Sequence, residues 1–350
     1  MVALLRTLAL AAVAVAVPLE VGVSLGTTDA APQCSGDKFS QTRPPRNAVV
    51  VDASGKQPNS FPTVNEAVAA LKNVTDEQSV FIYPGIYEEQ VRIPAHLGPI
   101  TIRGYTCDSR TYAGNQVTLT GKLNRQVPNI TSNDGTATLR IWTPNVKLYN
   151  LNVANTAGQQ AKNGQALAIS AQKTNFGAYA CKFTGYQDTV YANVGRQIYA
   201  QTYINGAVDF IFGLNASAWF EGCDLEVIGK GWVTASGRDS AQNPAWFVFN
   251  KTRVFGDQKG LAFLGRPWRT FARVLFQYSD LSDVVQPAGW APWDATSSLA
   301  NVVFNEYKNT GLGAAGQRAN FSSQIDAPVK AETVLGKGFD KEWWVDKSYL

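Results

Sequence analysis

Short runs in which apolar and polar residues alternate recur along most of the chain at a nearly regular interval. One run places Ala178, Cys181 and Phe183 at the first, fourth and sixth positions of a six-residue pattern. The same pattern returns 21 residues later, where Thr202 takes the place of Cys181. Further copies begin at Leu148, Phe220, Phe247 and Phe276. The chain therefore contains an internal repeat, and its spacing of roughly 20 to 30 residues is typical of stacked coils.

The residue types in these runs favour a parallel β-solenoid over a leucine-rich repeat. The runs use Val, Ile, Phe and Tyr, which suit strands, and they lack a dense leucine framework. Equivalent positions in consecutive coils should lie one strand spacing apart, roughly 4.8 Å. Asp188 and Asp209 are 21 residues apart and should therefore be stacked neighbours. Two carboxylates at that distance repel unless one is protonated or a cation intervenes. A polar ladder or two solvated loop acids would explain the spacing equally well.

The two ends of the repeat differ from its middle. Residues 49–52 predict a strand, and residues 61–71, with Pro62 near their start, predict a helix that would cap the open end of the solenoid. Short strands are expected between residues 80 and 104. At the other end, residues 321–344 predict a tail that packs on the outer surface, with its two tryptophans in packing contacts.

Residues 1–31 predict a signal peptide and processing region. A short positively charged start precedes an apolar run over residues 7–17, which is too short to cross a membrane. Small residues around Ala30 and Ala31 suit a cleavage site, and a position nearer Ala16 stays open. Residues 32–350 show no linker-like change of composition, so we expect a single elongated domain in a secreted, extracellular protein. Five sequons agree with a secreted glycoprotein, at Asn73, Asn129, Asn215, Asn250 and Asn320.

Charge and cysteine content narrow the functional classes. The formal net charge is +4, and the basic residues are scattered, which argues against a nucleic-acid partner. A mildly basic extracellular protein suits an acidic polymer such as a polyuronate, although solubility alone would also explain the charge. Cys181 and Cys223 share a repeat position two coils apart, roughly 9.6 Å, which is too far for a disulfide. We expect two buried thiols there, and the state of Cys34 and Cys107 stays open.

Several common catalytic systems lack their residues. His96 is the single histidine, and no Gly-x-Ser-x-Gly motif is present, which argues against a Ser-His-Asp hydrolase. One histidine and four dispersed cysteines give no zinc cluster, and no glycine-rich phosphate loop occurs. Carboxylate chemistry remains.

Five motifs together resemble the pectin methylesterases, carbohydrate esterase family 8. They keep the order of that family and span roughly residues 45–330. The motifs are Gly85-Ile-Tyr-Glu-Glu89, Gly164-Gln-Ala-Leu-Ala168, Gly185-Tyr-Gln-Asp-Thr-Val-Tyr191, Val208-Asp-Phe-Ile-Phe-Gly213 and Leu264-Gly-Arg-Pro-Trp268. The resemblance implies a right-handed parallel β-helix, an active site without metal or cofactor, and hydrolysis of polygalacturonate methyl esters to pectate and methanol. The chain has fewer matching cysteines than plant members and no large pro-domain, so it is more similar to a fungal or bacterial enzyme.

The resemblance also implies roles for five residues. Asp209 would be the nucleophile, Asp188 the acid and then the base, and Arg266 the partner of Asp209. A guanidinium beside Asp209 would keep it ionised, while the anionic neighbour would keep Asp188 protonated. Gln165 and Gln187 would donate to the oxyanion, which side-chain amides can do without losing a proton. Water activated by Asp188 would then open an acyl-enzyme anhydride.

Substrate contacts are implied at Trp268, as a sugar platform, and at Val208. Trp290 and Trp293 match a groove-lining aromatic segment, and which of them faces the substrate stays open. The expected partner is methylated homogalacturonan, bound by a monomer that needs neither nucleic acid nor membrane.

Two other functions remain possible at this point. A β-helix glycosidase would also use paired carboxylates, and a retaining one requires them about 5 to 5.5 Å apart. Spacing does not separate the two chemistries, but an oxyanion hole has no task in glycoside cleavage. A carbohydrate-binding solenoid would be expected to lose one of the acids, and both are present.

Overall fold

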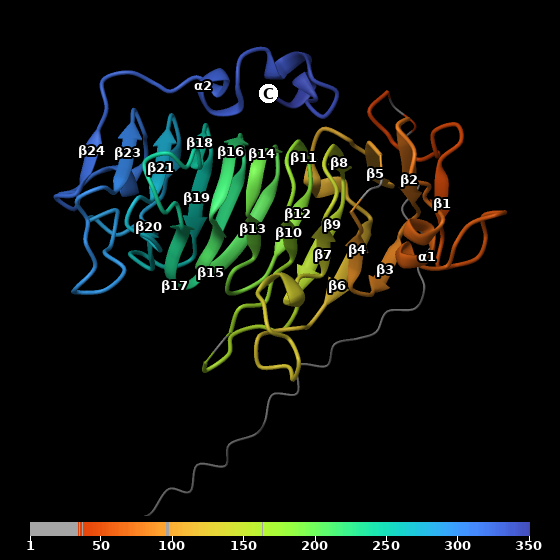
Figure 1. The fold of residues 1–350 in the computed structure, drawn as a ribbon, viewed down its shortest axis with the longest axis horizontal. Helices are drawn as coiled ribbons and strands as arrows, with labels where there is room; N and C mark the ends of the chain where they lie inside the picture. The colour runs from red at the N-terminus through yellow and green to blue at the C-terminus, as the bar shows by residue number, and fades with distance from the viewer. Residues whose placement is uncertain (1–33, 35, 37, 96–97, 163) are drawn as a thin grey trace, which may run out of the picture. The chain divides into compact units, whose positions relative to one another are not determined.

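The alternating runs fold into short strands that pair in parallel with those of neighbouring coils (Figure 1). The computed structural model describes residues 34–350 except 35, 37, 96, 97 and 163, so the predicted signal peptide lies outside the described residues. Residues 33–350 belong to one compact unit, a parallel β-helix, which is the predicted fold class. No helix among the described residues has the length and apolar character needed to cross a membrane.

One sheet forms a continuous wall along the β-helix. Its eleven strands follow the order β1 (Val49–Val51), β2 (Gln78–Ile82), β5 (Ile100–Gly104), β8 (Val146–Tyr149), β11 (Phe176–Tyr179), β14 (Val194–Ala200), β16 (Asn215–Glu221), β18 (Trp246–Asn250), β21 (Arg273–Gln277), β23 (Val303–Tyr307) and β24 (Ser322–Gln324).

The second sheet has two arms that join at long strands. One arm contains β3 (Gly85–Glu88), β6 (Val117–Gly121), β9 (Asn152–Asn155) and β12 (Lys182–Thr184). The other contains β4 (Val91–Ile93), β7 (Leu139–Ile141), β10 (Ile169–Ala171) and β13 (Val190–Ala192). The arms meet at β15 (Tyr203–Gly213), followed by β17 (Asp224–Ser236), with β19 (Arg253–Gly256), β20 (Ala262–Pro267) and β22 (Asp280–Leu281) beyond it.

A two-residue corner links the first sheet to the second in six consecutive coils. The first residue of each corner has a positive φ, between 49° and 56°, at Asn150, Ala180, Gln201, Gly222, Lys251 and Tyr278. The second residue points into the core; Cys181 and Cys223 occupy this place and are buried free thiols, as predicted. The opposite edge of the coil varies, from residues 122–138 between β6 and β7 to residues 185–189 between β12 and β13.

Aromatic side chains stack inside the coils at the spacing of the strands. Neighbouring rings of Tyr199, Phe220, Phe249 and Phe276 lie 4.7, 4.4 and 4.3 Å apart and nearly parallel. This ladder corrects one part of the predicted repeat, because Phe220 pairs with Phe249 and not with Phe247. Alternation has a period of two, so a frame shifted by two residues buries the same face and satisfies the same pattern.

The two α-helices lie near the two ends of the described chain. Helix α1 (Val64–Ala69) begins three residues later than predicted, because the Thr63 side chain accepts the hydrogen bond that caps it. It contacts β1, β2 and β4, and its proposed capping role stays a prediction. Short 3-10 helices occur at Tyr112–Gly114, Asp134–Thr136, Leu312–Ala314, Phe339–Lys341 and Lys347–Tyr349.

The C-terminal segment runs back across the first sheet (Figure 1), as predicted. Helix α2 (Ala331–Leu335) contacts β14 and β16. Trp344 is buried in this contact, and its backbone oxygen accepts a hydrogen bond of 2.8 Å from the hydroxyl of Tyr179. A bidentate pair between Arg196 and Glu342 holds the same segment.

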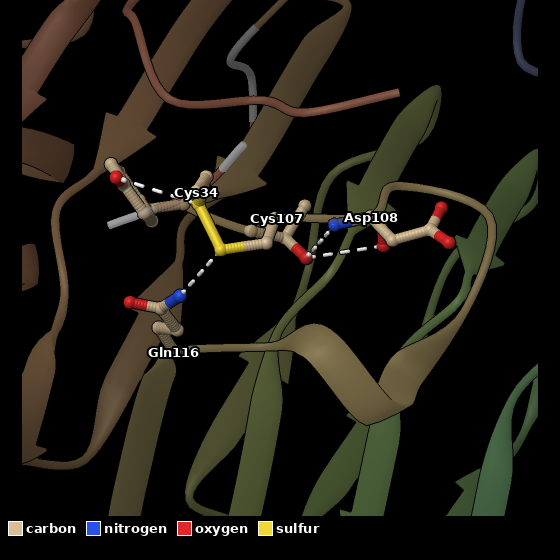
Figure 2. Close-up of a disulfide and its surroundings, with 6 residues drawn as sticks. Cys34, Cys107, Asp108 and Gln116 are labelled. Atoms are coloured by element: carbon tan, nitrogen blue, oxygen red, sulfur yellow. Dashed lines mark hydrogen bonds between the residues drawn. A yellow bond between two sulfur atoms is a disulfide. The ribbon is translucent and has the colours of Figure 1, made fainter. Parts of the chain in front are cut away.

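A disulfide links the N-terminal segment to the loop after β5 (Figure 2). It joins Cys34 to Cys107 across 73 positions and settles the pairing that the sequence left open. The side-chain amide of Gln116 donates a hydrogen bond of 3.2 Å to the sulfur of Cys107. The disulfide therefore ties the start of the described chain to the first coils.

Candidate active site

Asp188 and Asp209 occupy equivalent positions in neighbouring coils, as the repeat predicted. The flanking pairs fix this register, since Phe183 pairs with Ile204 and Val190 with Ile211. The backbone N–H of Asp188 donates a 3.0 Å hydrogen bond to the carbonyl oxygen of Val208. Both aspartates have a positive φ, 64° and 50°, a conformation that aspartate adopts more readily than most residues. The coil therefore fixes the backbone of both aspartates.

Arg266, from β20, clamps the carboxylate of Asp209. Its Nε and terminal nitrogen donate to the two carboxylate oxygens at 2.9 and 2.6 Å, a bidentate geometry that fixes orientation as well as charge. The guanidinium lies between two indole rings, 3.6 Å from the centroid of Trp232 and 4.1 Å from that of Trp293. Stacking on both faces leaves the guanidinium little freedom to rotate away from Asp209.

The two carboxyls have different electrostatic surroundings. Burial raises the pKa of Asp188 well above its ordinary value; the charge of Asp209 raises this pKa further, and Arg266 opposes both effects. Burial also raises the pKa of Asp209, but there the hydrogen bonds and the charge of Arg266 act directly against it. These surroundings favour the negative charge of the pair on Asp209 and the proton on Asp188.

A pocket of about 290 Å³ opens over the two carboxyls. Its wall consists of Asn133, Gln165, Gln187, Asp188, Asp209, Phe212, Ala235, Arg266, Trp268 and Trp293. The site thus brings together the five residues for which the sequence implied catalytic roles. Among the described residues, the cysteines, aspartates and glutamates form no group of three or more that would hold a metal ion.

The two glutamines lie on neighbouring coils and both line the pocket. The carbonyl oxygen of Gln187 accepts a backbone hydrogen bond of 3.1 Å from Ala166, which fixes the spacing of the coils. The side-chain oxygen Oε1 of Gln165 is buried and finds no hydrogen-bond partner among the described residues. With that oxygen turned into the protein, the amide nitrogen of Gln165 is the end that can donate into the pocket. A Cβ at position 164 would lie 2.7 Å from Oε1 of Gln187. Any residue larger than Gly164 would therefore displace the side-chain amide of Gln187.

The proposed substrate-contacting residues separate into two groups. Trp268 and Trp293 line the pocket, and Trp268 packs edge-on against Phe212 with ring centroids 6.0 Å apart. Trp290 does not line it: its side chain is 1% exposed, stacks on Phe304 and donates to Glu306. The expected contact between Trp290 and substrate is therefore corrected, because the indole fills the solenoid interior.

Val208 also lies outside the pocket wall. It is half-buried, forms a parallel bridge with Gln187, and pairs with Trp232 of the next coil. Its backbone oxygen accepts the N–H of Asp188, so its described contacts position an acid and give it no direct contact with the pocket.

Sequence reasoning missed two residues at this site, Asn133 and Trp232. The side-chain amide of Asn133 donates a 3.0 Å hydrogen bond to Oδ2 of Asp188 across 55 positions. Its surroundings, Ser132-Asn133-Asp134-Gly135, indicate a turn and carry no signal for a distant partner. Trp232 had a weak signal, since it lies only three positions before Ala235, which pairs with Arg266.

Comparison with known proteins identifies the family of the chain. A sequence model of the Pectinesterase family matches residues 48–334. A pectinesterase from Aspergillus niger is 44% identical over 316 residues, which cover 87% of this chain and 93% of that protein.

Solved structures show the same fold. The crystal structure of the pectin methylesterase from Aspergillus niger, in a penultimately deglycosylated form, superposes with a TM-score of 0.81 at 34% identity and covers 89% of this chain and 100% of that one. The pectin methylesterase from carrot superposes with a TM-score of 0.76 at 29% identity and covers 86% of this chain and 97% of that one.

Proposed function

The chain belongs to the Pectinesterase family and acts on the methyl esters of pectin, and we propose that it does so through an acyl-enzyme intermediate on Asp209. The observation that carries this proposal is the asymmetry of the two carboxyls. One is clamped by Arg266 at 2.9 and 2.6 Å, and the other is buried without a cationic partner of its own. An ionised nucleophile beside a protonated acid is the arrangement that acyl transfer requires.

The first half of the reaction forms the intermediate. A carboxylate oxygen of Asp209 attacks the carbonyl carbon of the galacturonate methyl ester, and the carbonyl π electrons move onto its oxygen. The amides of Gln165 and Gln187 donate hydrogen bonds to this oxyanion. When the oxyanion collapses, the bond to the methoxy oxygen breaks and Asp188 gives its proton to that oxygen. Methanol leaves, and an anhydride joins Asp209 to the sugar acid.

The second half regenerates the enzyme. Asp188, now ionised, takes a proton from a water molecule as that water attacks the anhydride. The bond between Asp209 and the acyl group breaks, which releases the galacturonate and restores the Asp209 carboxylate beside Arg266. Asp188 is protonated again by the proton from this water, which replaces the one that left with methanol. Each turnover therefore consumes one water and produces one methanol and one carboxylic acid.

The substitution Asp209→Asn tests the intermediate. We expect methanol release from methylated pectin to be lost while polymer binding is kept, because the amide preserves the shape of the groove but does not attack. The matched control Asp257→Asn changes an exposed aspartate outside the pocket and should be fully active. Substantial methanol release by Asp209→Asn would refute the nucleophile. New reducing ends from the unmodified enzyme would indicate glycoside cleavage instead.

Membership of the same family also suggests where the enzyme acts. We propose that residues 1–31 are removed during secretion and that residues 32–350 act outside the cell as one monomeric domain on the pectin polymer. The sequons at Asn73, Asn129 and Asn320 are exposed and suitable for glycosylation. Asn250 is not suitable, because its side chain is buried and donates to Glu221 at 2.7 Å.

A further inference from the structure

The long loop between β6 and β7 reaches across the coils and places Asn133 against Asp188. The amide nitrogen of Asn133 lies 3.0 Å from Oδ2 of Asp188 and donates to it. This amide also forms part of the pocket wall. Asn133 therefore contacts the acid of the proposed mechanism from a loop that is distant from Asp188 in the sequence.

The turn that carries Asn133 is anchored independently of Asp188. The backbone oxygen of Asn133 accepts hydrogen bonds of 2.9 and 2.8 Å from the N–H and the hydroxyl of Thr136. Asp134 is buried and accepts from Arg140 at 3.0 and 2.5 Å and from the indole nitrogen of Trp142 at 3.2 Å. The side chain of Asn133 makes no capping hydrogen bond within the turn. A rigid turn thus presents a free amide to the carboxyl.

A carboxylic acid has two unlike oxygens, one that accepts and one that carries the proton. An amide N–H held against Oδ2 makes Oδ2 the accepting oxygen, which leaves Oδ1 as the site of the proton. We propose that Asn133 is a positioning residue that fixes which oxygen of Asp188 delivers the proton to the departing methanol. This inference rests on the proposed function, because it assigns a detail of the acid step.

The other groups that act on Asp188 are charged or titratable. Asp209 on β15 raises the pKa of Asp188, and Arg266 on β20 lowers it. Burial, with smaller contributions from the charges of Asp134 and Asp188, raises the pKa of Tyr191 on β13 to about 12, so the phenol stays neutral. Asn133 is an uncharged donor to this carboxyl. A donor stabilises the carboxylate more than the acid, so from its hydrogen bond we expect Asn133 to favour the ionised form of Asp188.

The test is the pH dependence of kcat/KM in two substitutions of Asn133. Asn133→Leu keeps the size of the side chain and removes the donor, so the basic limb, which reports loss of the Asp188 proton, should move up by about one pH unit. Asn133→Asp adds a carboxyl beside Asp188 and should move this limb further in the same direction. Both should have a lower kcat because the proton is no longer confined to Oδ1.

The control is Ser132→Ala, which removes a hydroxyl that accepts within the same turn but does not contact Asp188. It should leave the basic limb in place. Lower activity in both Asn133 variants with an unmoved basic limb would overturn the proposal and reduce Asn133 to a structural residue. Asp188→Asn separates the two hypotheses. If it retains full methanol release, the proposed mechanism fails; if it is inactive and Asn133→Leu keeps the wild-type limb, only the role of Asn133 fails.

Discussion

Replacing Arg266 with methionine removes the charge that separates the two carboxyls. Methionine fills the space between Trp232 and Trp293 but donates nothing to Asp209. Two short charge-assisted hydrogen bonds are lost from a carboxylate that is only 5% exposed, so water screens little of the effect. A neighbouring arginine typically lowers a carboxyl pKa by about 1 to 3 units. The acidic limb of kcat/KM, which reports formation of the Asp209 carboxylate, should therefore move up by about 1 to 3 pH units.

Arg266→Met should also make the stability of the enzyme depend more strongly on pH. An ionised, unpaired Asp209 would cost roughly 3 to 5 kcal/mol, and protonation removes that cost. With the folded-state pKa of Asp209 raised further above the unfolded value, the variant should keep its stability at acid pH and lose it as pH rises through the folded-state pKa. Thermal unfolding of Arg266→Met should therefore show a midpoint that falls with pH more steeply than in the unmodified enzyme.

The matched control is Arg253→Met. Arg253 also forms a bidentate pair, with Asp224 at 3.0 and 3.0 Å, but its side chain is 53% exposed and lies outside the pocket. Its removal should change neither limb. Methanol release measured across pH decides the outcome. A reduced plateau with an unmoved acidic limb would show that Arg266 orients Asp209 without setting its ionisation. Full activity would remove Arg266 from the mechanism.

Three further predictions concern stability and substrate contact. Asp188→Asn should raise the thermal midpoint, increasingly so as pH rises, because the raised pKa of Asp188 makes its ionisation costly in the folded enzyme; an unchanged midpoint in thermal scans would contradict this. Trp268→Ala should raise KM for pectin with little change in stability, whereas Trp290→Ala should cost about 3 to 5 kcal/mol of unfolding free energy and leave KM unchanged. The opposite results would show that Trp290 contacts the substrate and that Trp268 serves packing. Cys34→Ser should lower the free energy of unfolding by about 4 kcal/mol, measured with denaturant, and leave kcat unchanged.

The repeat made much of the fold predictable, because residues at equivalent positions must stack. The alignment of Asp188 with Asp209 needed nothing more than the 21-residue offset. Near residue 247 the predicted repeat was shifted by two residues. Phe247 and Phe249 both face inward, so the alternating pattern does not distinguish them. Coil length there depends on the loop at residues 237–245, whose course is set by tertiary contacts.

The site was predictable only where it follows the repeat or a family motif. Arg266 lies 57 positions from Asp209, and no period relates them; the resemblance alone paired them. Asn133 belongs to neither category, since a turn sequence gives no indication of which distant carboxyl its side chain meets. Trp290 and Trp293 lie in one short segment, so the sequence left open which of them faces the substrate; the burial of Trp290 involves stacking on Phe304, a distant residue.

The two-residue corners have a consequence for how such a protein can change over time. An extra residue at Ala180 or Lys251 would turn the following strand over and expose its core face, so insertions there should be eliminated. At the opposite edge, residues 122–138 already form a long excursion that leaves β6 and β7 in register. Changes in loop length are therefore tolerated mainly on one side of the β-helix, the side that holds the pocket. Longer loops on that side can change which polymer the enzyme prefers, while the β-helix keeps its fold.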